Sequence, residues 1–267
     1  MEFLGCNPSK KDLRNYKIRA TASQIDNLPD EFELPKYSFI KNQGSVGSCV
    51  PHVISEILEY HNHGQNKLST NFLYGIKREL CDDLSQGMYL SDACKIATKY
   101  GDMLESDCPG NVEIPHAWYE AESAYANAEK MERAYTFRLS GYFTCKTNND
   151  IKVALQNYGP VAACIDWYQG CRVKNDGTFI YNTKRKSTYH CIMIYGWNKN
   201  GFLCQNSFGK SWGNEGCFIL PYDYTIGDAR ALVDEYNPEE EALIIPKTNK
   251  FLDFWYKILN WFINLVN

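Results

Sequence analysis

The chain has 267 residues, which is long enough for one large domain or for two lobes around a shared cleft. Hydrophobic residues make up 44% of the chain and charged residues 22%, fractions that are typical of a globular protein. The net charge of −4 and the lack of a long Lys/Arg run exclude the usual signature of a nucleic-acid-binding protein, so no nucleic-acid partner is expected.

The N-terminal region, residues 1–24, is polar and charged with little apolar periodicity, and it predicts an extended arm. It contains no apolar stretch long enough for a signal peptide, which favours an intracellular protein, with a virion or a membrane surface as alternative locations. The eleven cysteines include no C-x-x-C pair, so a structural zinc site is not expected. We expect most of these thiols to be reduced.

The two halves of the remaining chain have different hydrophobic patterns. In the first half, apolar residues recur at helical spacing after Cys49, so a helix is predicted to begin near this residue. Residues 70–80 and 90–100 also predict helices. Short apolar runs bounded by Gly, Pro and Asn predict strands in the second half, at residues 159–165, 191–195, 201–205 and 216–220. This pattern indicates an α+β fold with a cleft between a helical lobe and a β lobe.

The C-terminal tail, residues 241–267, ends in an apolar and aromatic stretch at 251–266. Its polar residues fall on one narrow helical stripe: Asp253, Lys257, Asn260 and Asn264. A helix of this length reaches about 24 Å, less than the ~30 Å of a hydrocarbon core, so a spanning helix is disfavoured. We expect residues 251–266 to form a helix that docks on the domain or on a partner subunit. The alternative is a membrane surface with Trp255, Tyr256 and Trp261 at the headgroups.

Cys49 is a candidate nucleophile because it follows a Gly-Ser turn and opens a predicted helix. Unpaired N–H groups and the helix dipole favour a thiolate there, so a lowered pKa is expected for Cys49. A cysteine nucleophile that performs acyl transfer also needs an acid/base, a group that orients it and donors for the oxyanion. Residue types alone do not choose among the five histidines: His52, His61, His63, His116 and His190. No acidic or thiol residue is spaced to complete a metal site with His61 and His63, so no metal is expected.

Three segments carry a more specific pattern: Lys41–Cys49 (KNQGSVGSC), Tyr189–Trp197 (YHCIMIYGW) and Cys204–Phe218 (CQNSFGKSWGNEGCF). They resemble the active-site, histidine and Asn-Ser-Trp-Gly peptides of the papain/cathepsin family of cysteine peptidases. The spacings agree as well: 49 − 43 = 6 from Gln to Cys, 190 − 49 = 141 from Cys to His, and 206 − 190 = 16 from His to Asn. The resemblance covers about residues 25–222.

This resemblance implies a papain-like two-lobed fold over residues 25–240, with the active site between a helical lobe and a β-barrel-like lobe. It implies Cys49 as the nucleophile and His190 as its acid/base partner. Asn206 would orient His190, and the Gln43 side chain would hold the oxyanion together with the Cys49 N–H. The implied activity is that of an endopeptidase acting on peptides or proteins through an acyl-enzyme, with no cofactor. A transferase or amidase with the same triad, and a catalytically silent peptide-binding relative, remain alternatives.

The sequence departs from the family pattern at several positions. Val46 and Val50 stand where the family usually has Cys and Trp, and the missing Cys removes a characteristic disulfide. Phe208 replaces the Trp that usually covers the asparagine, whereas Trp212 matches the second family tryptophan. Both are expected to shield the His–Asn pair from water. Tyr189 precedes the histidine where several relatives carry Asp, so a different pH profile is expected.

The resemblance to the family also implies a set of substrate-binding positions. Gly87-Met88 resembles the stretch whose backbone pairs with substrate, and Gly47 matches a glycine beside the first specificity pocket. Four apolar residues would border the pocket for the second residue before the scissile bond (P2): Leu90, Val161, Cys164 and Cys191. We therefore expect a hydrophobic P2 preference; the alternative is that these are ordinary core positions.

The arm is short compared with the folded inhibitory prosegment of the family, so such a prosegment is not expected here. Two paths remain open for residues Cys6 to Arg19. They could lie across the cleft and hold the enzyme latent, or they could wrap around the back of the molecule.

Overall fold

The computed structural model describes residues 5–7, 9, 16–36, 38–82, 86–109, 116–185 and 187–234, with the side chains of 116–120 left out. The chain divides into two compact units, Met1–Glu235 and Tyr236–Asn267. The predicted C-terminal helix at 251–266 lies outside the described residues. None of the described helices is long and apolar enough to cross a lipid bilayer.

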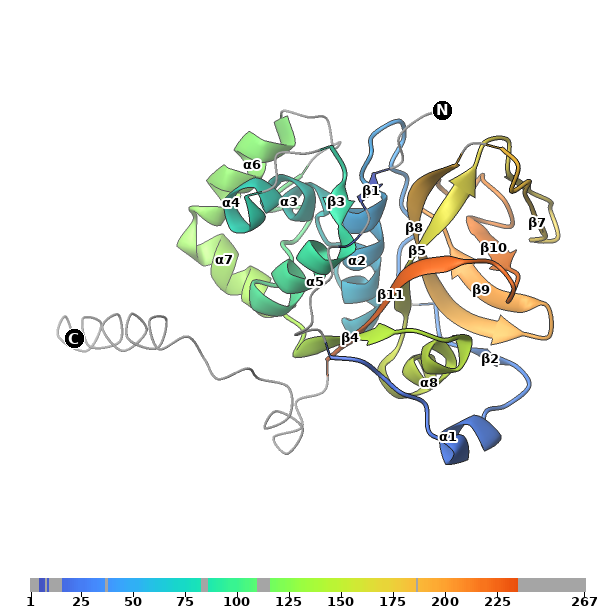
Figure 1. Cartoon of the computed structure of the whole chain (residues 1–267). Helices are drawn as coiled ribbons and strands as arrows, with labels where there is room; N and C mark the ends of the chain where they lie inside the picture. The colour runs from blue at the N-terminus through green and yellow to red at the C-terminus, as the bar shows by residue number, and fades with distance from the viewer. Residues whose placement is uncertain are drawn as a thin grey trace. The chain divides into compact units, whose positions relative to one another are not determined.

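The first half of the chain forms a helical lobe (Figure 1). Its helices are α2 (Cys49–His61), α3 (Thr70–Gly75), α4 (Lys77–Cys81), α5 (Leu90–Lys99), α6 (His116–Tyr125) and α7 (Ala128–Tyr135). The segment 70–80, predicted as one helix, is two short helices separated by Ile76, and the preceding Gly75 is a poor helix former.

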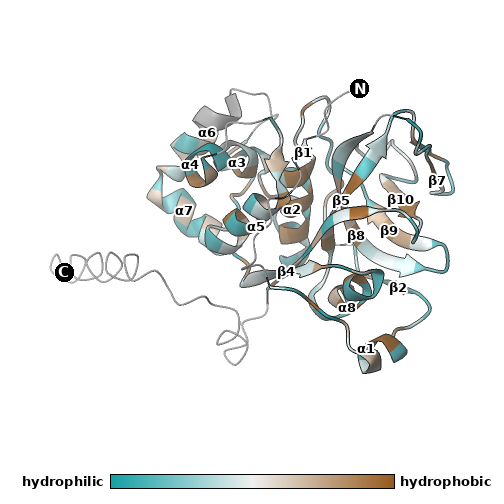
Figure 2. Ribbon diagram, viewed as in Figure 1, coloured by the Kyte–Doolittle hydropathy of each residue, from teal (hydrophilic) through white to brown (hydrophobic). Residues whose placement is uncertain are grey.

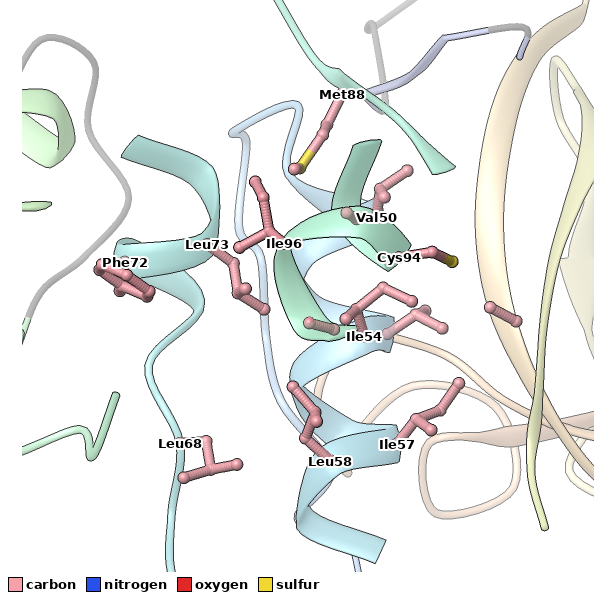
Figure 3. Packing of buried hydrophobic residues seen from close by; sticks show 14 of the residues in the cluster. Val50, Ile54, Ile57, Leu58, Leu68, Phe72, Leu73, Met88, Cys94 and Ile96 are labelled. Atoms are coloured by element: carbon pink, nitrogen blue, oxygen red, sulfur yellow. The ribbon is translucent and has the colours of Figure 1, made fainter. Parts of the chain in front are cut away.

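Helix α2 is the centre of this lobe. Figure 2 shows hydrophobic residues concentrated along it, and almost all of its side chains are buried. Val50, Ile54 and Leu58 recur every four residues, so they form one continuous apolar row. This row packs against residues from α3, α5 and the intervening segments (Figure 3): Leu68, Phe72, Leu73, Met88 and Ile96. Cys49 at the start of α2 is therefore fixed by a well-packed helix.

The second half forms an antiparallel sheet with the strand order β10-β9-β8-β5-β11-β4, to which β2 adds by pairing with β8. The strands are β2 (Phe32–Glu33), β4 (Gly141–Cys145), β5 (Val161–Tyr168), β8 (Ser187–Asn198), β9 (Gly201–Gln205), β10 (Cys217–Leu220) and β11 (Ile226–Val233). The four predicted strand segments correspond to β5, β8, β9 and β10, and β8 begins earlier than predicted. The predicted α+β class is confirmed.

Smaller elements complete the described chain. Helix α1 (Ala22–Asp26) begins within residues 1–24, which were predicted to be extended, and α8 (Asn148–Tyr158) starts with a capping box made by Thr147 and Asp150. Strands β6 (Arg172–Val173) and β7 (Phe179–Ile180) pair with each other. Strands β1 (Cys6–Asn7) and β3 (Met88–Tyr89) form a separate two-stranded parallel sheet.

The two lobes meet where α2 lies against β5 and β8 (Figure 1). Side chains alternate between the two faces of a strand, and the two hydrophobic clusters follow this alternation. On β8, Cys191 and Met193 belong to the cluster of the helical lobe, whereas Ile192 and Ile194 belong to the core of the sheet. Residues 190 and 191 therefore lie at the lobe boundary, beside the first turn of α2.

Candidate active site

Cys49 is the first residue of α2 and is fully buried. Its Sγ accepts a hydrogen bond from the backbone N–H of Cys191, with 3.3 Å between the two atoms. Burial raises the pKa of the Cys49 thiol to about 12, although backbone hydrogen bonds from Cys191 and Val50 act in the opposite direction. The lowered pKa expected from the helix N-terminus is thus not found in this conformation, because exclusion of water outweighs the local donors.

His190 lies on β8 and is fully buried. Its Nε2 is 2.7 Å from Oδ1 of Asn206. Burial lowers the pKa of His190 to about 4, opposed by the hydrogen bond to Asn206. A neutral ring that donates from Nε2 leaves Nδ1 as a proton acceptor. Within the described residues, this Nδ1 has no hydrogen-bond partner.

Asn206 follows the end of β9 and is held by the surrounding turn. Its Oδ1 also accepts the backbone N–H of Ser207 at 2.8 Å, and its own N–H donates to the carbonyl oxygen of Gly216 at 2.9 Å. These bonds fix the oxygen that faces His190, so the imidazole has a defined orientation.

Aromatic side chains cover the His190–Asn206 pair. Phe208 stacks on His190 with 5.1 Å between ring centroids and 24° between planes, and Trp212 meets Phe208 edge-on at 5.4 Å. Trp167 adds an edge contact to His190 at 4.7 Å. Trp167 was not predicted from the sequence. Its position follows from sheet register: Ile165 pairs with His190, and Trp167 lies two residues further along β5 on the same face.

Gln43 is fixed by the same turn that holds Asn206. Its Oε1 accepts the Ser207 hydroxyl at 2.6 Å, and its backbone N–H donates to the Ser207 carbonyl oxygen at 2.8 Å. The Gln43 Nε2 donates to the carbonyl oxygen of Val46 at 2.9 Å. Ser207 is a second residue that sequence reasoning missed; its position directly after Asn206 is the one signal that the sequence offers.

The Cys49 thiol contacts the backbone next to His190. The donor to Cys49 Sγ is the N–H of Cys191, the residue directly after His190. In the part of the chain that is described, no hydrogen bond joins Cys49 Sγ to His190 Nδ1. The site is thus assembled, with its thiol turned towards the β8 backbone.

Comparison with known proteins shows which family has this arrangement of residues. Residues 28–229 match the family model for papain family cysteine proteases. The chain belongs to this family.

Similar proteins within the family span several kingdoms. A cathepsin B-like cysteine proteinase 3 of Caenorhabditis elegans is 24% identical over 227 residues, which is 72% of this chain and 61% of the relative. Cysteine proteinase 3 of Entamoeba histolytica is 28% identical over 197 residues, 68% of this chain and 59% of the relative. The chain thus spans about three fifths of these relatives. The solved structure of xylellain, a cysteine protease from Xylella fastidiosa, has a TM-score of 0.75 at 20% identity and covers 88% of this chain and 97% of its own.

The family positions that differ here have clear structural surroundings. Val50 is fully buried on α2 and packs in the core of the helical lobe. Val46 packs against the buried Tyr74. Phe208 lies over the His190 ring, so a side chain smaller than the usual family tryptophan still covers it.

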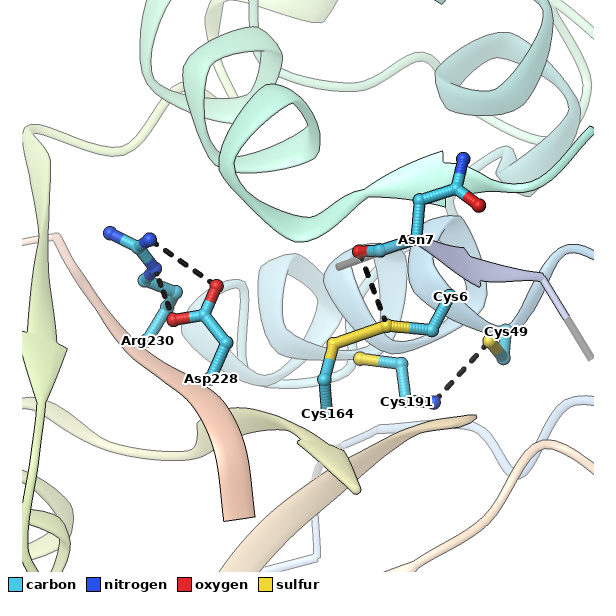
Figure 4. The surroundings of a disulfide bond; sticks show 7 residues. All are labelled: Cys6, Asn7, Cys49, Cys164, Cys191, Asp228 and Arg230. Carbon is cyan, nitrogen blue, oxygen red and sulfur yellow. Dashed lines mark hydrogen bonds and ion pairs between the residues drawn. A yellow bond between two sulfur atoms is a disulfide. The ribbon is translucent and has the colours of Figure 1, made fainter. Parts of the chain in front are cut away.

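The residues expected to bind substrate fall into two groups. Met88, Leu90, Cys164 and Cys191 belong to one cluster, which also contains Cys49. Val161 lies in the other cluster, the core of the sheet, so the structure leaves it apart from the rest. Gly47 lies in the turn before Cys49 and is half-buried, and the Gly87 carbonyl oxygen accepts Lys77 Nζ at 2.6 Å. Cys164 is joined to Cys6 by a disulfide (Figure 4).

The described residues contain no group of three or more His, Cys, Asp or Glu side chains that could hold a metal ion.

Proposed function

We propose that this chain is a cysteine endopeptidase that hydrolyses peptide bonds through a thioester acyl-enzyme on Cys49. One observation carries the proposal. The ring of His190 is held at Nε2 by Asn206, its Nδ1 has no hydrogen-bond partner among the described residues, and the next residue in the chain contacts the Cys49 thiol. This arrangement provides a nucleophile, a base and an orienting group in one place.

Acylation begins when the Cys49 Sγ leaves the Cys191 N–H and turns to His190 Nδ1. The imidazole takes the thiol proton, and the sulfur attacks the carbonyl carbon of the substrate. The imidazolium then protonates the leaving amine as the carbon–nitrogen bond breaks. In this step the bond between His190 Nε2 and Asn206 Oδ1 stabilises the charged ring, because an imidazolium is a stronger donor than a neutral imidazole.

The oxyanion is held by donors at the start of α2. The Gln43 side-chain amide and the Cys49 backbone N–H supply two N–H groups, and the Ser207 hydroxyl keeps the Gln43 amide in position. In deacylation, His190 removes a proton from water, and the hydroxide attacks the thioester. The acid and the thiol are then released, and the cycle closes without a cofactor.

A hydrophobic P2 side chain is the preference we propose for this site. Met88, Leu90 and Cys191 are buried apolar residues in the cluster that contains Cys49. A pocket with such walls stabilises an apolar side chain by removing it from water, at about 25 cal/mol per Å² buried.

The test is cleavage of a peptide library by the full chain in the presence of a thiol reductant. The Cys49→Ala and His190→Ala variants should each lose activity by about a thousandfold or more, because members of a triad act as a unit. Cys171→Ala is the matched control, since this half-buried thiol lies outside the site and its loss should leave cleavage unchanged. Cleavage by Cys49→Ala, or acyl transfer to amines without hydrolysis of any peptide, would contradict the proposal.

We propose a reducing compartment as the place of action. Nine of the eleven cysteines form no disulfide bond within the described residues, and reduced thiols persist where cellular reductants are abundant. Fractionation of cells that produce the tagged chain should recover it in the fraction of a reducing compartment and not in the secreted fraction. Recovery only outside the cell would contradict this location.

A further inference from the structure

The segment Gly5-Cys6-Asn7 lies along β3, which begins at Met88 in the Gly87-Met88 stretch expected to pair with substrate. Strand β1 runs parallel to β3, with Cys6 opposite Met88 and Asn7 opposite Tyr89. The Met88 N–H donates to the Gly5 carbonyl oxygen at 2.8 Å, and Asn7 Nδ2 donates to the carbonyl oxygen of Gln86 at 3.1 Å. The Met88 N–H, which a bound peptide would need, is therefore already in use.

The same segment reaches the turn that precedes the nucleophile. Gly5 has a φ of +104°, and a Cβ at this position would lie 2.0 Å from the carbonyl carbon and oxygen of Gly47 and 2.6 Å from the Ser48 nitrogen. Only glycine permits such close backbone contact. The segment thus occupies the space beside Gly47 and Ser48, the two residues that precede Cys49.

The side chain of Cys6 enters the region proposed for P2. Cys6 is almost fully buried in the cluster that contains Met88, Leu90 and Cys191. Its sulfur is bonded to Cys164 on β5, and Cys164 is the direct cross-strand neighbour of Cys191 on β8. Figure 4 shows the disulfide next to the Cys191 side chain, with Cys49 beyond it.

The covalent bond determines whether the segment stays in place. Each hydrogen bond of residues 5–7, such as the one from the Met88 N–H to the Gly5 carbonyl oxygen, contributes little because released groups bond to water instead. The disulfide joins residues 158 positions apart, so it keeps the segment at the site whatever the strength of these bonds. With the segment in place, both Cys49 and His190 are fully buried.

We propose that the Cys6–Cys164 disulfide locks residues 5–7 in the substrate-binding region and keeps the peptidase latent until a thiol reductant opens it. This inference rests on the proposed function of Cys49. In the opening step, two reductant thiols are oxidised to one disulfide, the bond between Cys6 and Cys164 breaks, and each cysteine sulfur takes up a proton. Release of the segment frees the Met88 N–H and the apolar pocket for a substrate, and it opens Cys49 to solvent.

The experiment compares Cys49 accessibility in oxidised and reduced full-length protein. Iodoacetamide labels the thiols over time, mass spectrometry locates the label, and non-reducing peptide mapping confirms the Cys6–Cys164 bond. In the oxidised wild type, Cys49 should react at least about tenfold more slowly than after treatment with glutathione, because a buried thiol is inert. Cys6→Ser should react quickly without any reductant, and Cys171→Ser, the matched control, should behave as the wild type.

A second variant tests the proposal independently in case Cys6→Ser does not fold. Deletion of residues 1–7 should also give fast labelling without reductant, and cooperative thermal unfolding of both variants shows that they are folded. Equal labelling of Cys49 in the oxidised and reduced wild type would overturn the lock, as would continued protection of Cys49 in both variants. Peptide hydrolysis is measured in parallel. If Cys49 becomes accessible on reduction but no peptide is cleaved, the lock stands and the proposed function fails.

Discussion

The side chains of His190 and Asn206 form a 2.7 Å hydrogen bond at Nε2 of the imidazole, while Nδ1 of the same ring is buried and unpaired among the described residues. This asymmetry defines the direction in which the ring can accept a proton. Asn206 fixes the Nε2 nitrogen of the ring. Cys49, the first residue of α2, contacts the backbone N–H of Cys191, the residue that follows His190.

Asn206→Ala should slow turnover by about tenfold or more, which corresponds to about 1.4 kcal/mol, because the ring loses its fixed orientation. If Asn206 positions the ring, its loss should also change the pKa of His190, which a general loss of packing at the site would not predict. The hydrogen bond to Asn206 raises the pKa of His190 against the effect of burial, so its loss should move this pKa further down in an NMR titration. Asn148→Ala, which removes an amide bonded to the Tyr222 carbonyl oxygen, is the control. An unchanged His190 titration in Asn206→Ala would contradict the role.

Ser207→Ala should lower kcat with little change in KM, because the hydroxyl holds the Gln43 amide that stabilises the oxyanion. Gln43→Ala should cost about a hundredfold in kcat, as for other single oxyanion donors. In the double variant the effects should not add, since Ser207 acts through Gln43. Steady-state kinetics of the three variants checks this. Fully additive losses would show that Ser207 does not act by positioning Gln43.

Phe208→Ala should reduce activity by roughly tenfold, because water then competes for the His190–Asn206 hydrogen bond. Phe208→Trp restores the larger aromatic surface and should keep activity near the wild-type level. The comparison of kcat/KM for the two variants is the measurement. Equal losses in both would point to packing strain at this position and against shielding.

The buried histidines should destabilise the protein in mild acid, whereas the buried carboxyl groups of Glu56 and Asp102, whose pKa values are raised by burial, act in the opposite direction. Burial lowers the pKa of His190 to about 4 and that of His52 to about 3, from 6.5 for an unperturbed histidine. Between these values and 6.5 the unfolded chain binds more protons at these two histidines, so their contribution to the free energy of unfolding decreases as the pH falls from 6.5. Each unit of pKa difference corresponds to about 1.4 kcal/mol once the pH is below both values. The contribution is complete above pH 6.5.

Urea unfolding at pH 7.5 and pH 5 measures this effect. His52→Asn keeps a side-chain donor for the Ser48 carbonyl oxygen but removes one titrating group, so from pH 7.5 to pH 5 its free energy of unfolding should fall less, or rise more, than that of the wild type. The same pH dependence in the wild type and in His52→Asn would contradict the assignment.

Local patterns in the sequence predicted much of the fold. The apolar spacing after Cys49 predicted α2, and runs bounded by Gly, Pro and Asn predicted β5, β8, β9 and β10. The pairing of His190 with Asn206 was expected from the family resemblance of two separate segments. These features depend on residues that are close in sequence or on motifs with a fixed spacing.

Other features depend on contacts between distant segments. Trp167 reaches His190 only through the register of β5 on β8, which no local pattern specifies. The partner of Cys6 could not be deduced, because eleven cysteines allow many pairings and these two are 158 residues apart. The raised pKa of Cys49 also depends on burial by the whole fold, whereas the helix N-terminus alone predicts the opposite direction.

The most direct test of the account is covalent labelling of the reduced full chain with an epoxide inhibitor of cysteine peptidases, followed by mass spectrometry. We expect one equivalent of inhibitor on Cys49, and no labelling in Cys49→Ser or after replacement of His190 by Ala. A label on another cysteine, or labelling that persists without His190, would contradict the assignment of Cys49 and His190 as the catalytic pair.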